Sequence, residues 1–342
     1  MIEMPDHMSD EERMLRILTI MSGERGRATP LNRKNASAIK ELSKATYDDE
    51  QIWDALKIPG PGGKTELMYA AKTGNIERTR FLLKRSVDID AETKDGTTAL
   101  MFASQGGHSD VVEELVKAGA DVDAERINGM TALLYASIKG DAPSVKVLIK
   151  AGADVEQTAK GVTALLIATE RGHTDVVEEL IDGNVDVNKG TYFTPLILAS
   201  TKGYEKIVDA LIKAGADVNK ASIDSVAPLI RASSAGHLNI VKALVKAGAD
   251  VNNGMPNKIT PLMEACETGH LDIVKYLVGK GADINAVSKY GDTAISLSAD
   301  KPKILRFLEH PTCVGCSIMG GRRTRSTTGT TGSARSVSPL MT

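Results

Sequence analysis

The stretch that decides the fold is Asp95–Asp123, which reads D-G-T-T-A-L-M-F-A-S-Q-G-G-H-S-D-V-V-E-E-L-V-K-A-G-A-D-V-D. It holds two short segments whose apolar residues have helical spacing. Thr98 predicts the N-cap of the first helix, because its hydroxyl can accept from a free amide of the first turn. Gly107 and Gly119 predict the helix ends, because glycine adopts the left-handed conformation at little cost. The stretch therefore predicts a helix-turn-helix unit.

The same block recurs along the chain at steps of 31 to 33 residues. The position of Thr98 is occupied, in chain order, by Thr65, Thr98, Thr131, Thr163, Thr194, Ala227, Thr260 and Thr293. These positions mark eight units, of which the first and the last are degenerate. Because one pair of short helices buries little surface alone, each unit must be covered by the next. The sequence thus predicts an all-α solenoid of stacked units.

These residues resemble the ankyrin repeat, whose pattern includes T-P-L-H-x-A, G-H and G-A-D-V-N. The resemblance covers about residues 63–310 and implies an ankyrin-repeat solenoid whose helix-turn-helix units are joined by β-hairpin loops. The family's histidine after T-P-L is replaced in every full unit by an apolar residue, such as Met101. The linkers Val155–Thr163 and Val187–Thr194 are shorter than the others, which predicts stunted hairpins there.

The flanks of the repeats differ from them in composition. Residues 61–310 form the expected repeat domain, and residues 1–60 precede it as a partly helical extension. A helix expected over Ser37–Leu56 would cap the first repeat, whose core would otherwise face water. Residues 311–342 contain four arginines and no acid, and are rich in Ser, Thr and Gly. Such a composition predicts a disordered basic tail.

This tail holds four candidate modification sites. Ser326 follows an arginine-rich run and Ser338 precedes a proline, so both resemble kinase substrates, and a phosphate there would cancel the tail's charge. Cys313 and Cys316 form a C-x-x-C pair. Acylation of the pair beside the arginines would anchor the chain to a membrane. A zinc or redox pair and idle thiols are the alternatives.

The bulk composition narrows the class of protein. The net charge is −2 and the pI is about 6.3, which does not fit a nucleic-acid binder. Apolar runs of the ~20 residues that a membrane helix needs are missing, and the first residues are acidic rather than basic. Three cysteines do not make a disulfide framework. We therefore expect an intracellular protein, in the cytoplasm rather than the nucleus.

Two patterns resemble functional sites. Gly62-Gly63-Lys64-Thr65 matches the end of a phosphate-binding loop, but Ile58 stands where the first glycine should be, and Thr65 is already expected as an N-cap. A histidine recurs about once per repeat, at His108, His173, His237 and His270. Their spacing follows the solenoid, so we expect them to support turns rather than to bind zinc. We expect no cofactor, no metal, no small-molecule substrate and no enzymatic activity.

The resemblance implies a scaffold or adaptor that binds other proteins through the concave face and the hairpin tips. Apolar or exposed residues expected at these tips are Ile127, Asn128, Met130, Tyr192, Phe193, Ile223, Val226, Ile259 and Tyr290. Aromatic and apolar side chains without a folding role often anchor interfaces. The alternative is a regulator that its basic tail localises to a membrane or a nucleic acid.

Overall fold

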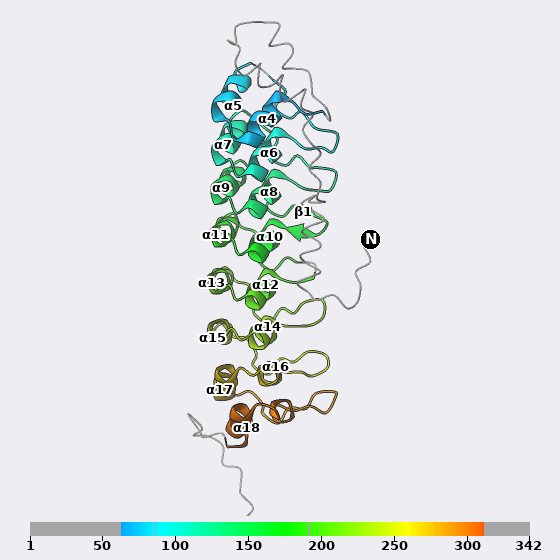
Figure 1. Ribbon diagram of the computed structural model, residues 1–342, viewed down its shortest axis with the longest axis vertical. Coiled ribbons are helices and arrows are strands. Elements are labelled where there is room, and N and C mark those ends of the chain that lie inside the picture. Colours follow the sequence, from blue (N-terminus) through cyan, green and yellow to red (C-terminus); the bar gives the residue numbers. More distant parts are fainter. Residues whose placement is uncertain (1–62, 86, 191, 311–342) are drawn as a thin grey trace, which may run out of the picture.

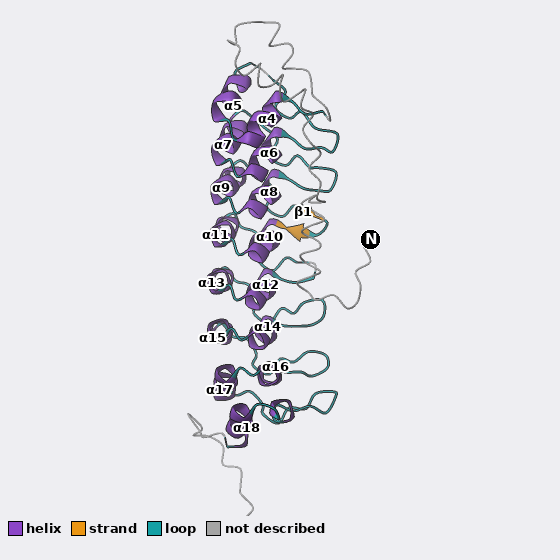
Figure 2. Ribbon diagram, in the orientation of Figure 1, coloured by secondary structure: helices purple, strands orange, loops and turns teal. Residues whose placement is uncertain are grey.

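The computed structural model describes residues 63–85, 87–190 and 192–310. They form an elongated stack of two rows of helices, with loops that project to one side (Figures 1 and 2). The first helices of the eight repeats are α4 (Glu66–Thr73), α6 (Ala99–Gly106), α8 (Ala132–Lys139), α10 (Ala164–Arg171), α12 (Pro195–Lys202), α14 (Pro228–Ala235), α16 (Pro261–Thr268) and the 3-10 helix η1 (Ser296–Ser298).

The second helices lie in the other row, farther from the projecting loops. These outer helices are α5 (Ile76–Leu83), α7 (Ser109–Lys117), α9 (Ala142–Lys150), α11 (Thr174–Asp182), α13 (Glu205–Lys213), α15 (Leu238–Lys246), α17 (Leu271–Gly279) and α18 (Pro302–Glu309). The loop from each outer helix to the next repeat is called a finger below, and it takes the number of the repeat that it leads into. The expected all-α solenoid is confirmed.

The helix boundaries follow the residues that predicted them. The Thr98 hydroxyl accepts from the Met101 amide at 3.4 Å. The threonines of this column that cap an α-helix in the same way are Thr65, Thr131, Thr163, Thr194 and Thr260. Ala227 is the exception, because its methyl group cannot accept a hydrogen bond. Gly107 ends α6 with φ of 75°, and Asn184 adopts φ of 70° where other units have glycine.

A continuous apolar core runs along the stack between the two rows. Its regular column of leucines consists of Leu67, Leu100, Leu133, Leu165, Leu196, Leu229 and Leu262, all at most 2% exposed. Outer helices contribute a second buried set, such as Val112 and Leu115 on α7. Because each leucine is covered by neighbouring repeats, the stability of a unit depends on the units beside it.

The recurring histidines join successive repeats. The Nε2 atom of His108 lies 3.1 Å from the carbonyl oxygen of Lys72, at the end of the preceding first helix. His173, His237 and His270 reach the equivalent carbonyls of Ile138, Thr201 and Ser234 at 3.2 Å. A carbonyl can only accept, so the ring donates. The interpretation of these histidines as turn supports is confirmed.

A ladder of short polar side chains also links the repeats at the base of the fingers. The amide of Asp121 donates to Oδ1 of Asp90 at 2.9 Å, and the amide of Asp250 donates to Oδ1 of Asn219 at 3.0 Å. Equivalent bonds follow in the other repeats from Asp90 to Asp283. The polar residues of the G-A-D-V-N motif are therefore structural, a role that the sequence analysis did not assign.

The shortened fourth finger contains a two-stranded antiparallel sheet. Strand β1 (Thr158–Ala159) pairs with β2 (Val162–Thr163). Lys160 and Gly161 connect them with φ of 52° and 82°, the two positive values of a tight hairpin turn. In the other fingers that the structure fully describes, the turn closes through backbone bonds without strands, as from the Arg126 amide to the Met130 carbonyl at 2.9 Å.

Buried hydroxyls at one position of the first helices suggest a stabilising change. The hydroxyls of Ser104, Ser200 and Ser233 are buried without a hydrogen-bond partner in the described part of the chain, whereas Ser137 donates to the Leu133 carbonyl at 2.8 Å. Replacing the first three serines with alanine is expected to raise the free energy of unfolding by roughly 0.5–1 kcal/mol each, because alanine leaves no unpaired polar group. Ser137→Ala should be neutral or destabilising. Urea unfolding of the four variants measures both effects.

Candidate partner-binding surface

Exposed large hydrophobic side chains concentrate on the finger side of the stack. Among the described residues they are Ile127 (76% exposed), Ile223 (65%), Tyr290 (75%), Val287 (52%), Ile295 (38%) and Tyr192 (37%). All lie in fingers except Ile295, which begins the turn into η1. The outer helices, on the opposite side in Figure 1, contribute none of these residues. Exposed apolar groups gathered on one side are typical of an interaction surface.

The structure separates the predicted tip residues into three groups by their exposure. Ile127, Ile223 and Tyr290 are strongly exposed, and Tyr192 is partly exposed. Asn128 and Ile259 are half-buried. Their role in partner binding stays a prediction.

Three predicted tip residues are buried, so their expected exposure was wrong. Met130, Phe193 and Val226 are 0%, 4% and 7% exposed. Each directly precedes the N-cap of a first helix, a position whose side chain turns back to pack on that helix. Val226, for example, packs with Ile230 of α14. These side chains hold the fingers against the repeats.

Two exposed residues, Val287 and Ile295, were missed. Ile295 continues the buried leucine column by its spacing from Thr293, but no further repeat covers it within the described residues. The position of both residues at the C-terminal end of the repeats was the available signal. Solenoid ends expose side chains that are buried in internal repeats.

Backbone hydrogen bonds join some finger tips to their neighbours. The amide of Ile127 donates to the Asp95 carbonyl at 3.1 Å, and the amide of Ile223 donates to the Tyr192 carbonyl at 3.2 Å. Near the C-terminal end, the amide of Lys289 donates to the Asn257 carbonyl at 2.8 Å. Linked tips lose less conformational freedom when a partner binds, which favours affinity.

A charged network fixes the second and third fingers to each other. The Arg126 guanidinium donates to Oδ2 of Asp95 from Nε at 3.0 Å and from Nη2 at 2.5 Å, and to the Tyr135 hydroxyl from Nη1 at 3.0 Å. Thr93 and Thr97 donate to Oδ1 of Asp95 at 2.6 and 2.8 Å. Burial acts to raise the pKa of Asp95, but these hydrogen bonds together lower it to about 2.

This pKa predicts a loss of stability in acid. The carboxyl titrates near 3.8 in an unfolded chain, so its contribution is complete above about pH 4 and disappears as the pH falls to about 2. Because 41% of the Asp95 side chain is exposed, we expect roughly 1 kcal/mol, less than the full linkage value. Asp95→Asn should remove that part of the pH dependence in urea unfolding. An unchanged pH profile would contradict this assignment.

The described residues lack the groupings that would indicate metal chemistry or a membrane span. No group of three or more His, Cys, Asp or Glu side chains in them could hold a metal ion. No described helix has the length and apolar character needed to cross a bilayer.

Thr65 caps α4 by accepting from the Met68 amide at 3.3 Å, as expected from the sequence. Burial raises the pKa of the Cys266 thiol, which makes it a poor nucleophile.

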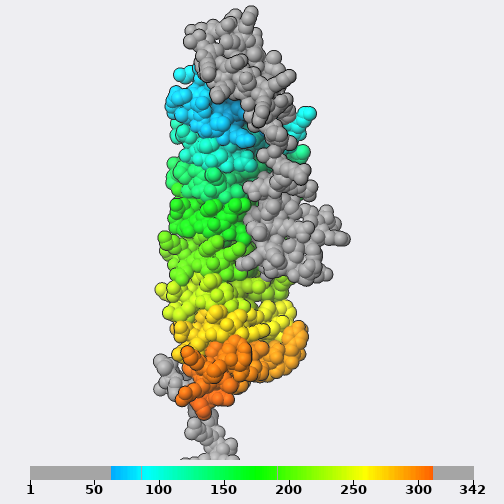
Figure 3. Space-filling model, viewed as in Figure 1, coloured from blue at the N-terminus to red at the C-terminus, as the bar shows by residue number. Residues whose placement is uncertain are grey.

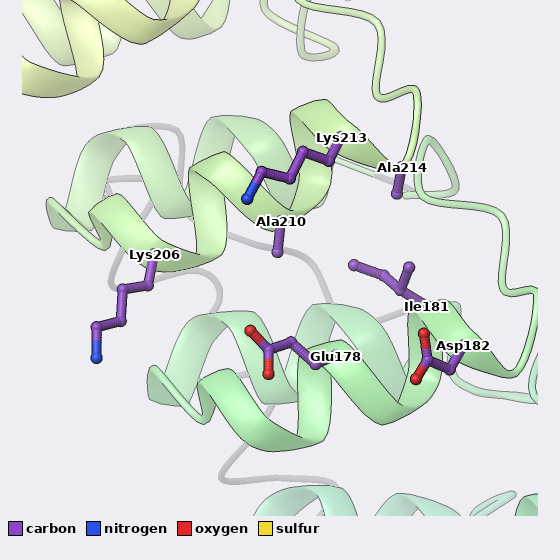
Figure 4. A pocket seen from close by; sticks show the side chains of 7 residues that line it. All are labelled: Glu178, Ile181, Asp182, Lys206, Ala210, Lys213 and Ala214. Carbon is purple, nitrogen blue, oxygen red and sulfur yellow. The ribbon is translucent and has the colours of Figure 1, made fainter.

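An open cavity of about 300 Å³ lies between α11 and α13 in the outer row (Figure 4). Ile181, Ala210 and Ala214 line it together with charged side chains, Glu178, Asp182, Lys206 and Lys213. The small side chains of Ala210 in α13 and of Ala214, directly after it, leave this space between the helices. The cavity is on the side away from the fingers, and no histidine, cysteine or serine lines it.

The remaining predicted residues are outside the described part of the chain. They are Cys313, Cys316, Ser326 and Ser338, together with the helix expected over Ser37–Leu56. Modification of the tail and capping by the N-terminal extension stay predictions.

A comparison with protein families supports the same fold. The family model for ankyrin repeats (3 copies) matches residues 31–126, 67–159, 133–222, 199–288 and 229–317, which together span more than half of the chain. No curated protein matches the chain significantly. Similar solved structures include the crystal structure of the human ASB11 ankyrin repeat domain, with 24% identity and a TM-score of 0.45, covering 72% of this chain and 97% of that one. The chain therefore belongs to the ankyrin-repeat family.

Proposed function

We propose that this protein is a scaffold or adaptor that holds one or more partner proteins on its finger side. Ankyrin repeats are in general protein-interaction modules, which supports the broad assignment. The observation that carries the finer proposal is the distribution of exposed apolar side chains. All six exposed large hydrophobic residues of the described chain lie in the fingers or directly after the last one.

The positions of these residues favour an extended partner. Ile127 belongs to the third repeat, Ile223 to the sixth and Tyr290 to the eighth. With helices packed ~8–10 Å apart, the first and last of these positions are separated by roughly 40–50 Å along the stack. Such a spacing suits a partner that contacts several fingers at once. The apolar side chains would act as separate anchors, surrounded by polar finger residues.

The experiment compares wild type with the triple variant Ile127→Ser, Ile223→Ser, Tyr290→Ser. These side chains are exposed, so the changes should leave the fold intact, which circular dichroism and urea unfolding can check. Affinity capture from native cells, quantified by mass spectrometry, should show at least a tenfold loss of specific partners. Interface anchors commonly contribute above ~2 kcal/mol each, which makes this loss a lower bound.

The matched control changes three exposed residues of the outer helices, Lys150→Ser, Asp209→Ser and Lys213→Ser. It should retain the partners at wild-type levels. A finger variant that also retains all of them would contradict the proposal, since the binding surface would then lie elsewhere on the chain. The working compartment and the tail-based alternative stay predictions.

A further inference from the structure

The outer helices carry a repeated charge position that changes character along the stack. This position is the fifth residue after the N-cap, occupied by Arg80 in α5 and Lys146 in α9. Both cations pair with a carboxylate of the following repeat. The Arg80 guanidinium lies 3.2 Å from Glu114, and the Lys146 ammonium lies 2.6 Å from Glu179. In α5 and α9 the position therefore forms ion pairs between repeats, whereas acids occupy it in α7, α11 and α13.

The last three repeats have a cation at this position but lack the carboxylate that would pair with it from the following repeat. Lys242 of α15, Lys275 of α17 and Arg306 of α18 occupy it, and we call these three residues the cationic ladder. The residues that correspond to Glu114 and Glu179 are Tyr276 in α17 and Phe307 in α18. On the outer face of the last three repeats, a cation is thus followed by another cation. In the earlier repeats, Arg80 and Lys146 are each followed by a carboxylate with which they pair.

Further cations surround the ladder. Lys246, Lys280 and Lys303 are exposed, as are the three ladder residues. Only two acids, Asp272 and Glu309, lie on α15, α17 and α18. The uncovered positive charge is destabilising by itself, because like charges repel in the folded state. A bound anion would remove this cost.

We propose that the cationic ladder binds an extended acidic peptide segment of a partner protein, with a carboxylate at about every third residue. Successive outer helices are ~8–10 Å apart, and an extended chain advances ~3.3 Å per residue. Carboxylates three residues apart therefore match the ladder. They would take the places that Glu114 and Glu179 fill in the earlier repeats.

The charge of the rest of the outer row favours a short peptide over a larger anionic surface. Helix α11 presents four acids, Asp175, Glu178, Glu179 and Asp182, and no cation. It lies two repeats from α15 in the same row (Figure 1). A membrane or a nucleic-acid duplex along this row would bring its charges close to those acids. A peptide that spans three repeats ends before reaching them.

The test measures binding of the full chain to a fluorescent peptide of repeated Glu-Ser-Gly triplets, by anisotropy at low ionic strength. The ladder variant Lys242→Glu, Lys275→Glu, Arg306→Glu should bind at least tenfold more weakly than wild type. A control with the same charge change on the fingers, Lys94→Glu, Lys160→Glu, Lys258→Glu, should stay within about threefold. If charge reversal disturbs the fold, the variant Lys242→Ala, Lys275→Ala, Arg306→Ala is used instead. Its affinity for the peptide should be at least threefold weaker than that of wild type.

Three results would overturn the proposal. Equal losses in the ladder and finger variants would mean that binding follows net charge alone. Binding would be assigned to the tail if it were lost on replacing Arg322, Arg323 and Arg325 with serine and unchanged in the ladder variant. The surface would be assigned to a membrane or to DNA if phosphatidylserine vesicles or duplex DNA bound the ladder more tightly than the peptide does. Each of these outcomes leaves the proposed function of the fingers unaffected.

Discussion

Leu165→Ala is expected to lower the free energy of unfolding by about 3 to 4 kcal/mol. Leu165 lies in α10, in the fourth of eight repeats, and is fully buried. Alanine would lose the transfer free energy of the side chain and leave a cavity between repeats. Because each repeat is stabilised mainly by its neighbours, damage in the middle should also weaken the coupling between the two halves. Urea unfolding followed by circular dichroism should show an earlier and broader transition.

The matched control is Leu308→Ala in α18. Leu308 is also buried, at 3% exposed, but it lies in the last repeat of the stack. Loss of packing there is limited to the stability of that one repeat, which can unfold while the others stay folded. We expect the main transition to shift by less than half as much as for Leu165→Ala. Equal shifts would show that the solenoid unfolds as a single unit rather than through neighbour coupling.

Gly203→Ala is expected to cost about 3 kcal/mol. Gly203 ends α12 with φ of 79°, a conformation that costs a residue with a Cβ ~1–2 kcal/mol. A Cβ atom there would lie 2.6 Å from Cε1 of His237, the ring that donates to the Thr201 carbonyl. The new methyl group would therefore have to displace the contact between the fifth and sixth repeats. Thermal and urea unfolding measure the loss.

Gly215 separates the two causes of this loss. It has a similar φ of 86°, but a Cβ there would have no neighbour within 4 Å. Gly215→Ala should thus cost only the conformational part, ~1–2 kcal/mol. The Gly203→Ala, His237→Ala double variant should be more stable than the sum of the two single changes predicts, since the alanine no longer meets the ring. Additive effects would mean that the ring moves aside freely.

The fold could be predicted in detail because the same local signals recur eight times. Thr98 and its equivalents predicted helix starts, and Gly107 predicted a helix end, each for a physical reason that holds in any unit. The replacement of glycine by Asn184 followed the same reason, since asparagine is the next most tolerant of positive φ. Repetition fixed the register, so an error in one unit would have been visible in the others.

The finger surface was predicted less well because exposure depends on where a loop folds back. Met130 and Ile127 are both apolar residues of one finger, three positions apart, and both were expected to be exposed at its tip. In the structure Met130 packs under a helix, whereas Ile127 faces solvent. The position directly before an N-cap was the signal that could have separated them.

The polar links between repeats were also beyond the sequence analysis. The bond from the Asp121 amide to Asp90 joins residues 31 positions apart, and only the stacking brings them together. The same holds for the network of Asp95, Arg126 and Tyr135. Repetition predicts that neighbouring units contact each other, but not which polar atoms meet.

The proposed binding surfaces use opposite sides of the elongated stack, which the space-filling view shows in the orientation of Figure 1 (Figure 3). The fingers offer apolar anchors such as Ile223 and Tyr290. The outer helices of the last repeats offer the cationic ladder. Two chemically different surfaces on one rigid stack would let the protein hold two partners together, as a scaffold requires.

Hydrogen exchange of the full chain, alone and with a partner recovered by capture, tests the central claim most directly. We expect slower exchange in the fingers around Ile127, Ile223 and Tyr290 when the partner is bound, with smaller changes in α7, α9 and α11. Protection confined to those outer helices, with unchanged exchange in the fingers, would contradict it.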